Sequence, residues 1–351
     1  MKSVLKLVLL VSLTLTFVGC PSDDNGPTIV VRDRQEVYSE NILEIENYLK
    51  TNYIELNANN DATVTKIPDA GVQTSIWNQY SLDGGLTFPS ITVKNDTRNN
   101  ITTTGGSTDV VDYKIYYILL NEGGGTKPTS IDSTLVGYKG WNLSNVTFDE
   151  NQSGSWFSYP EVNPSISGFR QVLQLIKTEA SNVQNSDGSV TRVNFGNIIA
   201  FIPSGLGYFG TPRSNIPAYS PTVFQIKLYD IKERDHDKDG ILSKYEDLNG
   251  NNNYFDDDTD GDGIPDFLDQ DDDGDGFLTK FEIRKPLPLQ ANQGTSLLYP
   301  FNPIVDDPLT PTINESEPKG IPSVSGDGTS PNRLRRHLDK NAKPPYTYTG
   351  Y

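Results

Sequence analysis

The chain has 351 residues and a formal net charge of −17 at pH 7. This length exceeds what one hydrophobic core usually organises, so we expect two or three structural units. The excess of carboxylates excludes a nucleic-acid partner, because phosphate backbones are bound by clustered Lys and Arg. Cations are the favoured partners, and much of the acidity lies between Asp235 and Glu282, which indicates a local cause.

Residues 1–19 have the layout of a secretory signal. Two lysines precede an apolar run, 7–18, that is too short to span a membrane. Cys20 is the only cysteine, so an intramolecular disulfide is excluded. The residues before Cys20 resemble the lipobox of bacterial lipoproteins. This resemblance implies a lipid on Cys20, a mature chain that begins there, and attachment to a membrane.

Residues 20–32 are predicted to be a linker that follows the lipidated cysteine. The pair Asp23-Asp24 resembles a surface-export signal known in one phylum of Gram-negative bacteria, and an ordinary disordered linker is the alternative. We therefore expect an exported, lipid-anchored protein at the outer membrane, either on the cell surface or not.

Residues 33–112 are predicted to be an N-terminal extension of one helix and a β/loop part. Apolar residues recur near helical spacing from Asp33 to Tyr53, which indicates an amphipathic helix. The segment from 62 to 112 is rich in Gly, Asn and Thr and contains short β-branched stretches such as 90–93. No function is predicted for this extension.

Residues 113–232 contain several β-favouring runs and one short helical pattern. Strands are expected at 114–120, 134–141, 198–202 and 223–231, and a helix at 169–176. This order predicts the α+β class, with a half-open antiparallel β-sheet wrapped around one short helix.

A series of motifs runs through the same region. They are Tyr138-Lys139-Gly140-Trp141, Phe148-Asp149, Trp156-Phe157, Ile166-Ser167-Gly168-Phe169, Ile202-Pro203-Ser204-Gly205-Leu206-Gly207-Tyr208, Ile216-Pro217 and Val223-Phe224. In this order they resemble the FKBP family of peptidyl-prolyl cis/trans isomerases. The resemblance covers the part of the chain between Tyr113 and Ile231.

The resemblance implies an apolar pocket that binds proline-containing polypeptides. Its implied lining is Tyr138, Phe148, Asp149, Trp156, Ile166, Phe169, Tyr208, Ile216 and Phe224. Rotation about an X–Pro bond passes a twisted, less polar amide, with a barrier of roughly 18–20 kcal/mol in water. A water-poor aromatic pocket favours that state over the planar amide, so no catalytic cofactor and no proton transfer are needed.

Three features depart from the family pattern. Phe209 follows Tyr208 where the family has Gly, Phe169 stands where it has Trp, and the segment 177–197 is longer than its helix-to-strand link. Phe209 could form an extra wall of the pocket or fold onto the surface. These departures keep a peptide-binding domain without isomerase activity open as an alternative.

Residues 233–285 contain three loops with alternating carboxylates. The first has Asp235, Asp237, Asp239, Ile241 and Glu246; the second has Asp258, Asp260, Asp262, Ile264, Asp266 and Asp269; the third has Asp271, Asp273, Asp275, Phe277 and Glu282. Their spacing fits the EF-hand calcium loop, in which the seventh residue offers its backbone carbonyl and Gly at the sixth permits a sharp turn. An acidic solvated run would not predict Gly at the sixth place in all three loops.

A full EF-hand needs an entering helix, but 229–231 is expected to end a strand. The array therefore resembles thrombospondin type 3 repeats more than paired EF-hands, and calcium is the expected structural cofactor. Residues 286–351 are rich in Pro, Asn and Lys and are predicted to be a mostly irregular tail.

Two functions remain open after these observations. The first is a peptidyl-prolyl isomerase that assists the folding of exported proteins. The alternative is a calcium-stiffened surface adhesion or scaffold protein. Retention of Asp149 and Tyr208 favours the isomerase.

Overall fold

The computed structural model describes residues 31–96, 109–160, 165–286, 296–305 and 316–346. Met1–Val31 and Arg32–Tyr351 form separate units, and the features below belong to the second. The predicted signal segment and Cys20 lie outside the described residues. Within those ranges, none of the helices has both the length and the apolar character that a membrane span requires.

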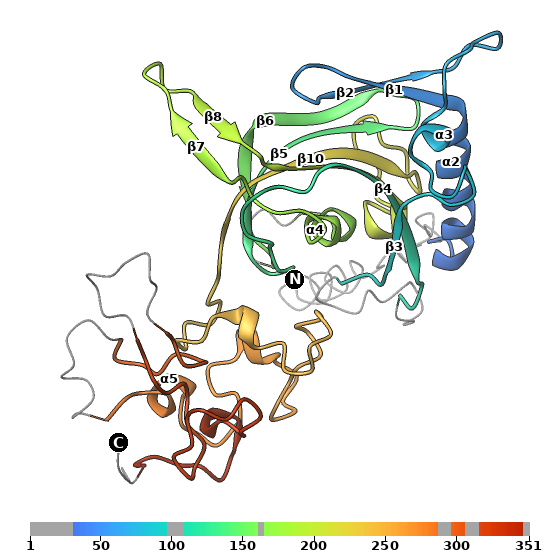
Figure 1. The fold of residues 1–351 in the computed structure, drawn as a ribbon. Coiled ribbons are helices and arrows are strands. Elements are labelled where there is room, and N and C mark those ends of the chain that lie inside the picture. The colour runs from blue at the N-terminus through green and yellow to red at the C-terminus, as the bar shows by residue number, and fades with distance from the viewer. Residues whose placement is uncertain (1–30, 97–108, 161–164, 287–295, 306–315, 347–351) are drawn as a thin grey trace, which may run out of the picture. The chain divides into compact units, whose positions relative to one another are not determined.

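The main element is a six-stranded sheet in which every neighbouring pair is antiparallel (Figure 1). Its strands, in spatial order, are β3 (Ser90–Val93), β4 (Tyr113–Asn121), β9 (Gly196–Ile202), β10 (Thr222–Lys232), β5 (Ser133–Asn142) and β6 (Thr147–Phe157). The predicted α+β class with an antiparallel sheet is confirmed. β3 precedes residue 113, the expected start of this domain, yet Ile91 pairs with Ile115, so the sheet extends into the N-terminal extension.

Strand β9 shows how the sheet uses both of its faces. Every residue of β9 is buried, and successive side chains alternate between two hydrophobic clusters, as the two-residue period of a strand requires. Ile198 and Ile202 join the inner cluster, whereas Ile199 and Phe201 join the outer one. A sheet that is buried on both faces needs a further layer of structure on each side.

The inner cluster is closed by α4 (Ser167–Leu173), which lies against the concave face of the sheet (Figure 1). Phe169, Val172 and Leu173 of this helix pack against Phe224 and Ile226 of β10. The helix expected at 169–176 is therefore present but begins and ends earlier.

The outer cluster is closed by the N-terminal extension. It consists of α2 (Arg34–Thr51), α3 (Ile76–Tyr80) and the hairpin of β1 (Asn52–Leu56) and β2 (Ala62–Lys66). Asp33 caps α2 by accepting the N–H of Glu36 at 2.9 Å, which satisfies one free donor at the start of the helix. Ile45 and Leu49 of α2 are fully buried against the sheet, so this extension is part of the folded domain.

A second hairpin explains the long link after α4. It is formed by β7 (Ser181–Gln184) and β8 (Val190–Val193), and three of its valines are exposed. Segment 177–197 is therefore longer than the helix-to-strand link of the FKBP pattern because it contains an additional β-hairpin.

The acidic region contains single turns rather than long helices: η2 (Ser243–Tyr245), η3 (Asp266–Leu268) and α5 (Thr279–Glu282). The described tail is mostly irregular, as predicted, with η4 (Arg336–Leu338) as its helical turn. It is nevertheless packed, because Ile241 and Ile283 of the acidic region share a small core with Tyr299 and Ile321 of the tail. The described residues of the acidic region and the tail therefore share a core across the boundary expected at 285.

Candidate functional site

Five aromatic side chains gather between the inner face of the sheet and α4. They are Tyr138 of β5, Phe148 and Phe157 of β6, Phe169 of α4 and Phe224 of β10. Neighbouring ring centroids lie 5.3 to 6.1 Å apart, mostly edge to face. We call this set the aromatic cluster. Phe169 and Phe224 are buried while the other three are half-buried, so the cluster offers an apolar wall to a ligand.

A polar rim borders the aromatic cluster. The Tyr138 hydroxyl donates to Oδ2 of the exposed Asp149 at 2.8 Å. Burial, followed by the adjacent Asp149 carboxylate, raises the pKa of Tyr138 to about 12. Burial, with a further contribution from the Asp149 charge, also raises the pKa of Tyr208. Both hydroxyls therefore stay protonated at neutral pH, and Tyr208 can donate to a substrate carbonyl.

Phe157, rather than the Trp156 expected from the sequence, packs in the aromatic cluster. Consecutive residues of a strand point to opposite faces, and here Phe157 faces the cluster. Trp156 is 36% exposed, and Lys232 places its ammonium 4.4 Å from the ring centroid. Two irregularities in the pairing of β5 with β6 set which of the two aromatic residues points inward.

The two isoleucines predicted for the pocket lie in different segments, one directly before α4 and the other in the loop that follows Tyr208. Ile166 is the N-cap residue of α4 and packs against the inner cluster, where its side chain lies close to Gly207. Ile216 is buried and exchanges backbone hydrogen bonds with Arg213 at 2.9 and 3.0 Å. Arg213 lies 5.8 Å from the ring centroid of Tyr208, so this loop borders Tyr208.

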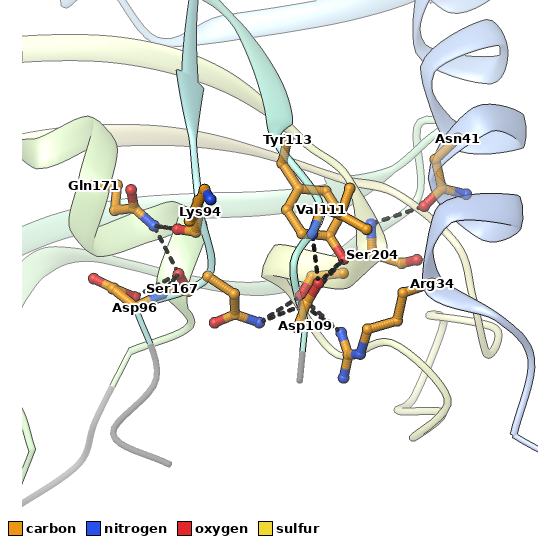
Figure 2. Close-up of polar contacts among 12 residues, drawn as sticks. Arg34, Asn41, Lys94, Asp96, Asp109, Val111, Tyr113, Ser167, Gln171 and Ser204 are labelled. Atoms are coloured by element: carbon orange, nitrogen blue, oxygen red, sulfur yellow. Dashed lines mark hydrogen bonds and ion pairs between the residues drawn. The ribbon is translucent and has the colours of Figure 1, made fainter. Parts of the chain in front are cut away.

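The turn before Tyr208 is held by side chains of the N-terminal extension (Figure 2). Asn41 of α2 accepts the backbone N–H of Ser204 at 2.9 Å. Asn95 donates to the carbonyl of Gly205 at 3.0 Å, and Arg34 donates to the same oxygen at 3.4 Å. α2 therefore positions the loop that carries Tyr208, a role that the sequence did not reveal.

A buried ion pair anchors this network. Arg34 lies 3.0 Å from Asp109, whose carboxylate also accepts from the hydroxyl of Tyr113 and the N–H of Val111 (Figure 2). Phe209, the residue that replaces the family's Gly, is buried beneath the Arg34 guanidinium at 4.1 Å. Its φ of 44° lies in the left-handed region that favours glycine. Phe209 therefore stabilises the network rather than forming a wall of the aromatic cluster.

The three acidic loops share one backbone geometry. In each loop the N–H of the sixth residue donates to the carboxylate of the first, at 3.2, 3.0 and 3.0 Å for Gly240, Gly263 and Gly276. These glycines have φ values of 103°, 94° and 92°, as the predicted sharp turn requires. The alternating carboxylates of each loop therefore point toward one place, the arrangement expected for a cation site.

The first loop is buried. Asp237, Asp239 and Glu246 are at most 8% exposed, and each has at least one carboxylate oxygen that meets no hydrogen-bond donor among the described residues. Burial and the neighbouring carboxylates raise the pKa of Asp237 to about 9. Burial raises the pKa of Asp239 to about 7. Carboxylates kept from water without a partner are strongly destabilising, so this set fits a bound cation.

The other two loops differ in exposure. Asp258, Asp260 and Asp262 form a group that is largely open to solvent. Asp269 interacts with Asp262 and Asp260 and fits the closing position of this loop, whereas Asp266 accepts from Thr259 at 2.7 and 2.8 Å.

In the third loop, Asp271, Asp273 and Asp275 lie within ligand distance of one another. Glu282 is fully buried, and burial raises its pKa to about 8, with Asp273 and Asp275 contributing. One of its oxygens accepts from Tyr346 and the other has no donor among the described residues.

Two features of this region were not predicted. Asp272 joins the first loop's carboxylates, although it is adjacent in sequence to the third loop. A fourth loop begins at Asp247, whose carboxylate accepts the N–H of Asn252 at 2.9 Å, and Asn252 has a φ of 63°. The Asn residues at its third, fifth and sixth places concealed this loop, although Asx spacing could have indicated it.

Comparison with protein families matches residues 236–312 to the family described as BamM C-terminal. No curated protein sequence matches the chain. The match spans the acidic region and the first part of the tail, in agreement with their common core.

Three solved structures are similar to part of the chain. FkpA from Escherichia coli is 26% identical with a TM-score of 0.27, and the match covers 34% of this chain and 48% of FkpA. A peptidyl-prolyl cis-trans isomerase from Pseudomonas syringae is 24% identical with a TM-score of 0.27, covering 34% and 76%. The N-terminal domain of FKBP42 from Arabidopsis thaliana is 14% identical with a TM-score of 0.28, covering 37% and 96%. At these TM-scores the likeness carries no argument by itself, and the chain spans about half the length of FkpA.

Proposed function

We propose that this protein is a peptidyl-prolyl cis/trans isomerase that acts on exported polypeptides. The observation that carries the proposal is the aromatic cluster with a rim of Tyr138, Asp149 and Tyr208. The apolar rings favour the less polar, twisted X–Pro amide, and the Tyr208 hydroxyl holds a substrate carbonyl in place. Binding is stronger in the transition state than in the ground state, so no group transfers a proton.

A protease-coupled assay with a proline peptide tests this proposal. Tyr208→Phe and Asp149→Ala should each lower kcat/KM by about tenfold, because each removes one polar contact worth about 1.5 kcal/mol. Circular dichroism should show an unchanged fold. Wild-type protein that does not accelerate isomerisation would contradict the proposal.

A matched pair of variants tests which aromatic residue lines the pocket. Phe157→Leu should lower the rate, because Phe157 contacts both Tyr138 and Phe169. Trp156→Leu should leave the rate unchanged, because Trp156 lies outside the aromatic cluster. The reverse result would support the arrangement expected from the sequence.

A peptide-binding scaffold without isomerase activity is the second candidate. Phe169 favours it, because a phenyl ring is a smaller pocket floor than the indole that the FKBP pattern has. Binding of proline peptides that survives in both Tyr208→Phe and Asp149→Ala, with no catalysis in wild type, would select this candidate.

We also propose that the acidic loops bind calcium as a structural cofactor. Support comes from the shared loop geometry and from buried carboxylate oxygens without donors. Glu246→Gln should weaken binding at the first loop and Glu282→Gln at the third, while isomerisation stays unchanged. Calorimetry with calcium chloride on chelator-treated protein measures both, and no heat at millimolar calcium would contradict the assignment.

We propose, finally, that a lipid on Cys20 holds the chain at the bacterial outer membrane. The signal-like segment before Cys20 and the match of residues 236–312 to the BamM C-terminal family support this location and a partner in outer-membrane assembly. Cys20→Ser should move the protein from the outer-membrane fraction to the soluble fraction. An unchanged distribution would contradict the anchor.

A further inference from the structure

Four buried carboxylates from separate parts of the acidic region meet at one point. They belong to Asp237, Asp239 and Glu246 of the first loop and to Asp272. Their exposed fractions are 8%, 1%, 3% and 2%. One ligand oxygen from each lies within 4.8 Å of those of the other three. We call these four residues the buried acidic centre.

Asp272 is the member that no local spacing predicts. Its neighbours Asp271 and Asp273 turn toward the third loop, whereas Asp272 turns toward Asp239 and Glu246. Its backbone N–H donates to the hydroxyl of Thr279 at 3.3 Å, which ties the start of the third loop to α5. Residues adjacent in sequence therefore belong to two different carboxylate groups, Asp272 to that of the first loop and Asp271 and Asp273 to that of the third.

The oxygens of this centre have no donor to satisfy them. Neither oxygen of Asp272 and neither oxygen of Glu246 accepts a hydrogen bond from any described residue. Asp237 and Asp239 each have one further oxygen in the same condition. Buried charges persist only when they are paired or coordinate a metal, and no Lys or Arg is among the ion partners described for these four residues.

We propose that Asp272 is a ligand of the cation held by the first loop, and that this shared site is the tightest calcium site of the protein. This inference rests on the calcium binding proposed above. Calcium binds oxygen ligands at 2.3–2.6 Å, so ligands on opposite sides of one ion lie about 5 Å apart, and the four ligand oxygens lie close enough together to share one ion. Four carboxylates lie within 4.8 Å of one another here, against three in each of the other two groups, and ligand charge and rigidity set affinity.

The shared ligand makes one ion a cross-link between two loops. Asp235 to Glu246 contributes three carboxylates and the start of the third loop contributes the fourth. The site is complete only when both segments are folded, so its binding free energy stabilises both. Among the described residues, the open group of Asp258, Asp260 and Asp262 includes no ligand from outside its own loop.

Calorimetric titration of the full, chelator-treated chain with calcium chloride tests the inference. Asp272→Asn should weaken the tightest binding phase by roughly 100-fold, because even indirect partners of a metal site cost 10–100-fold when removed. The matched variant Asp262→Asn removes a carboxylate of the open group. It should weaken a later phase and leave the tightest one unchanged.

Thermal unfolding separates a ligand from a purely structural side chain. Without calcium, Asp272→Asn should leave the unfolding curve unchanged, because the acidic region is then expected to be unfolded already. With saturating calcium it should lower the Tm. A lower Tm in both conditions with an unchanged tight phase would overturn the inference.

A second variant covers the case in which Asp272→Asn does not fold. Asp272→Glu keeps the charge but lengthens the side chain, so it should weaken the tight phase and lower the Tm at saturating calcium. An unchanged tight phase in this variant would also overturn the inference. Absence of calcium binding in the wild-type protein would instead overturn the calcium proposal as a whole.

Discussion

The sheet domain and the acidic region reach a folded state by different physical means. In the sheet domain, two hydrophobic clusters cover both faces of β9, and buried charges such as Arg34 and Asp109 satisfy each other. In the acidic region the apolar clusters are small, and several buried carboxylate oxygens meet no donor among the described residues. The named buried charges of the first region pair with each other, whereas the calcium proposal assigns the compensation of the second region's buried carboxylates to bound cations.

The stability of each region therefore depends on its amino-acid composition and on the solvent conditions rather than on its secondary structure. Burial of apolar surface stabilises the sheet domain under any ionic condition that keeps water as the solvent. A site that forms only with its ion makes binding free energy part of folding free energy. One chain can therefore contain a permanent fold and a conditional one.

Calcium removal should give the largest effect and should distinguish the acidic region from the sheet domain most clearly. A chelator should abolish the amide protection of residues 233–286, because their carboxylates then repel one another without compensation. Strands β9 and β10 should keep their protection. Hydrogen exchange on the full chain, with and without calcium, measures both. Equal protection of the acidic region in the two conditions would remove the distinction.

Loss of the buried ion pair should give the next largest effect. Arg34→Met leaves Asp109 buried and uncompensated, which should lower the free energy of unfolding by about 3–5 kcal/mol. Denaturant unfolding should report the same loss with and without calcium. Arg32→Met, which removes exposed ion pairs with Glu36 and Glu40, is the control and should change stability by less than about 1 kcal/mol.

A cavity in each region compares their cores directly. Ile199→Ala in the sheet domain should cost about 2–5 kcal/mol, independently of calcium, because Ile199 is fully buried in the outer cluster. Ile283→Ala in the acidic region should be measurable by denaturant unfolding only when calcium is present. A calcium-dependent loss for Ile199→Ala would contradict the independence of the sheet domain.

Acid should produce the smallest of the expected effects. Burial, with Arg335, Arg336 and Arg333 nearby, lowers the pKa of His337 from 6.5 to about 3. Its unfolded form therefore binds the proton first, so its contribution to stability is present above pH 6.5 and is lost as the pH falls toward 3. The loss is about 1.4 kcal/mol per pH unit at most. His337→Gln should lack it when unfolding is followed from pH 7 to pH 5.

Local pattern was sufficient for much of the fold. The strands β4, β5, β9 and β10 were predicted within a few residues, because continuous apolar runs signal buried strands. The three glycine-containing loops were found because their chemistry repeats at a fixed spacing. In both cases the determining residues are neighbours in sequence.

Contacts between segments that are distant in sequence could not be predicted from local patterns. Whether Trp156 or Phe157 faces inward depends on irregular pairing with β5, which no spacing within β6 reveals. Asp272 was not identified as a ligand from the sequence, because its partners come from the first loop. The contribution of α2 to the Tyr208 loop likewise depends on contacts between distant segments.

The network at the start of α2 has a mechanical consequence. Arg34 begins the helix, and Arg34 and Asn41 hold the turn before Tyr208. If the chain is tethered through Cys20, a pulling force on the anchor would load this end of α2 before any strand of the sheet. Under the proposed function, tension that distorts the Tyr208 loop while the sheet remains intact would make isomerisation responsive to force at the membrane.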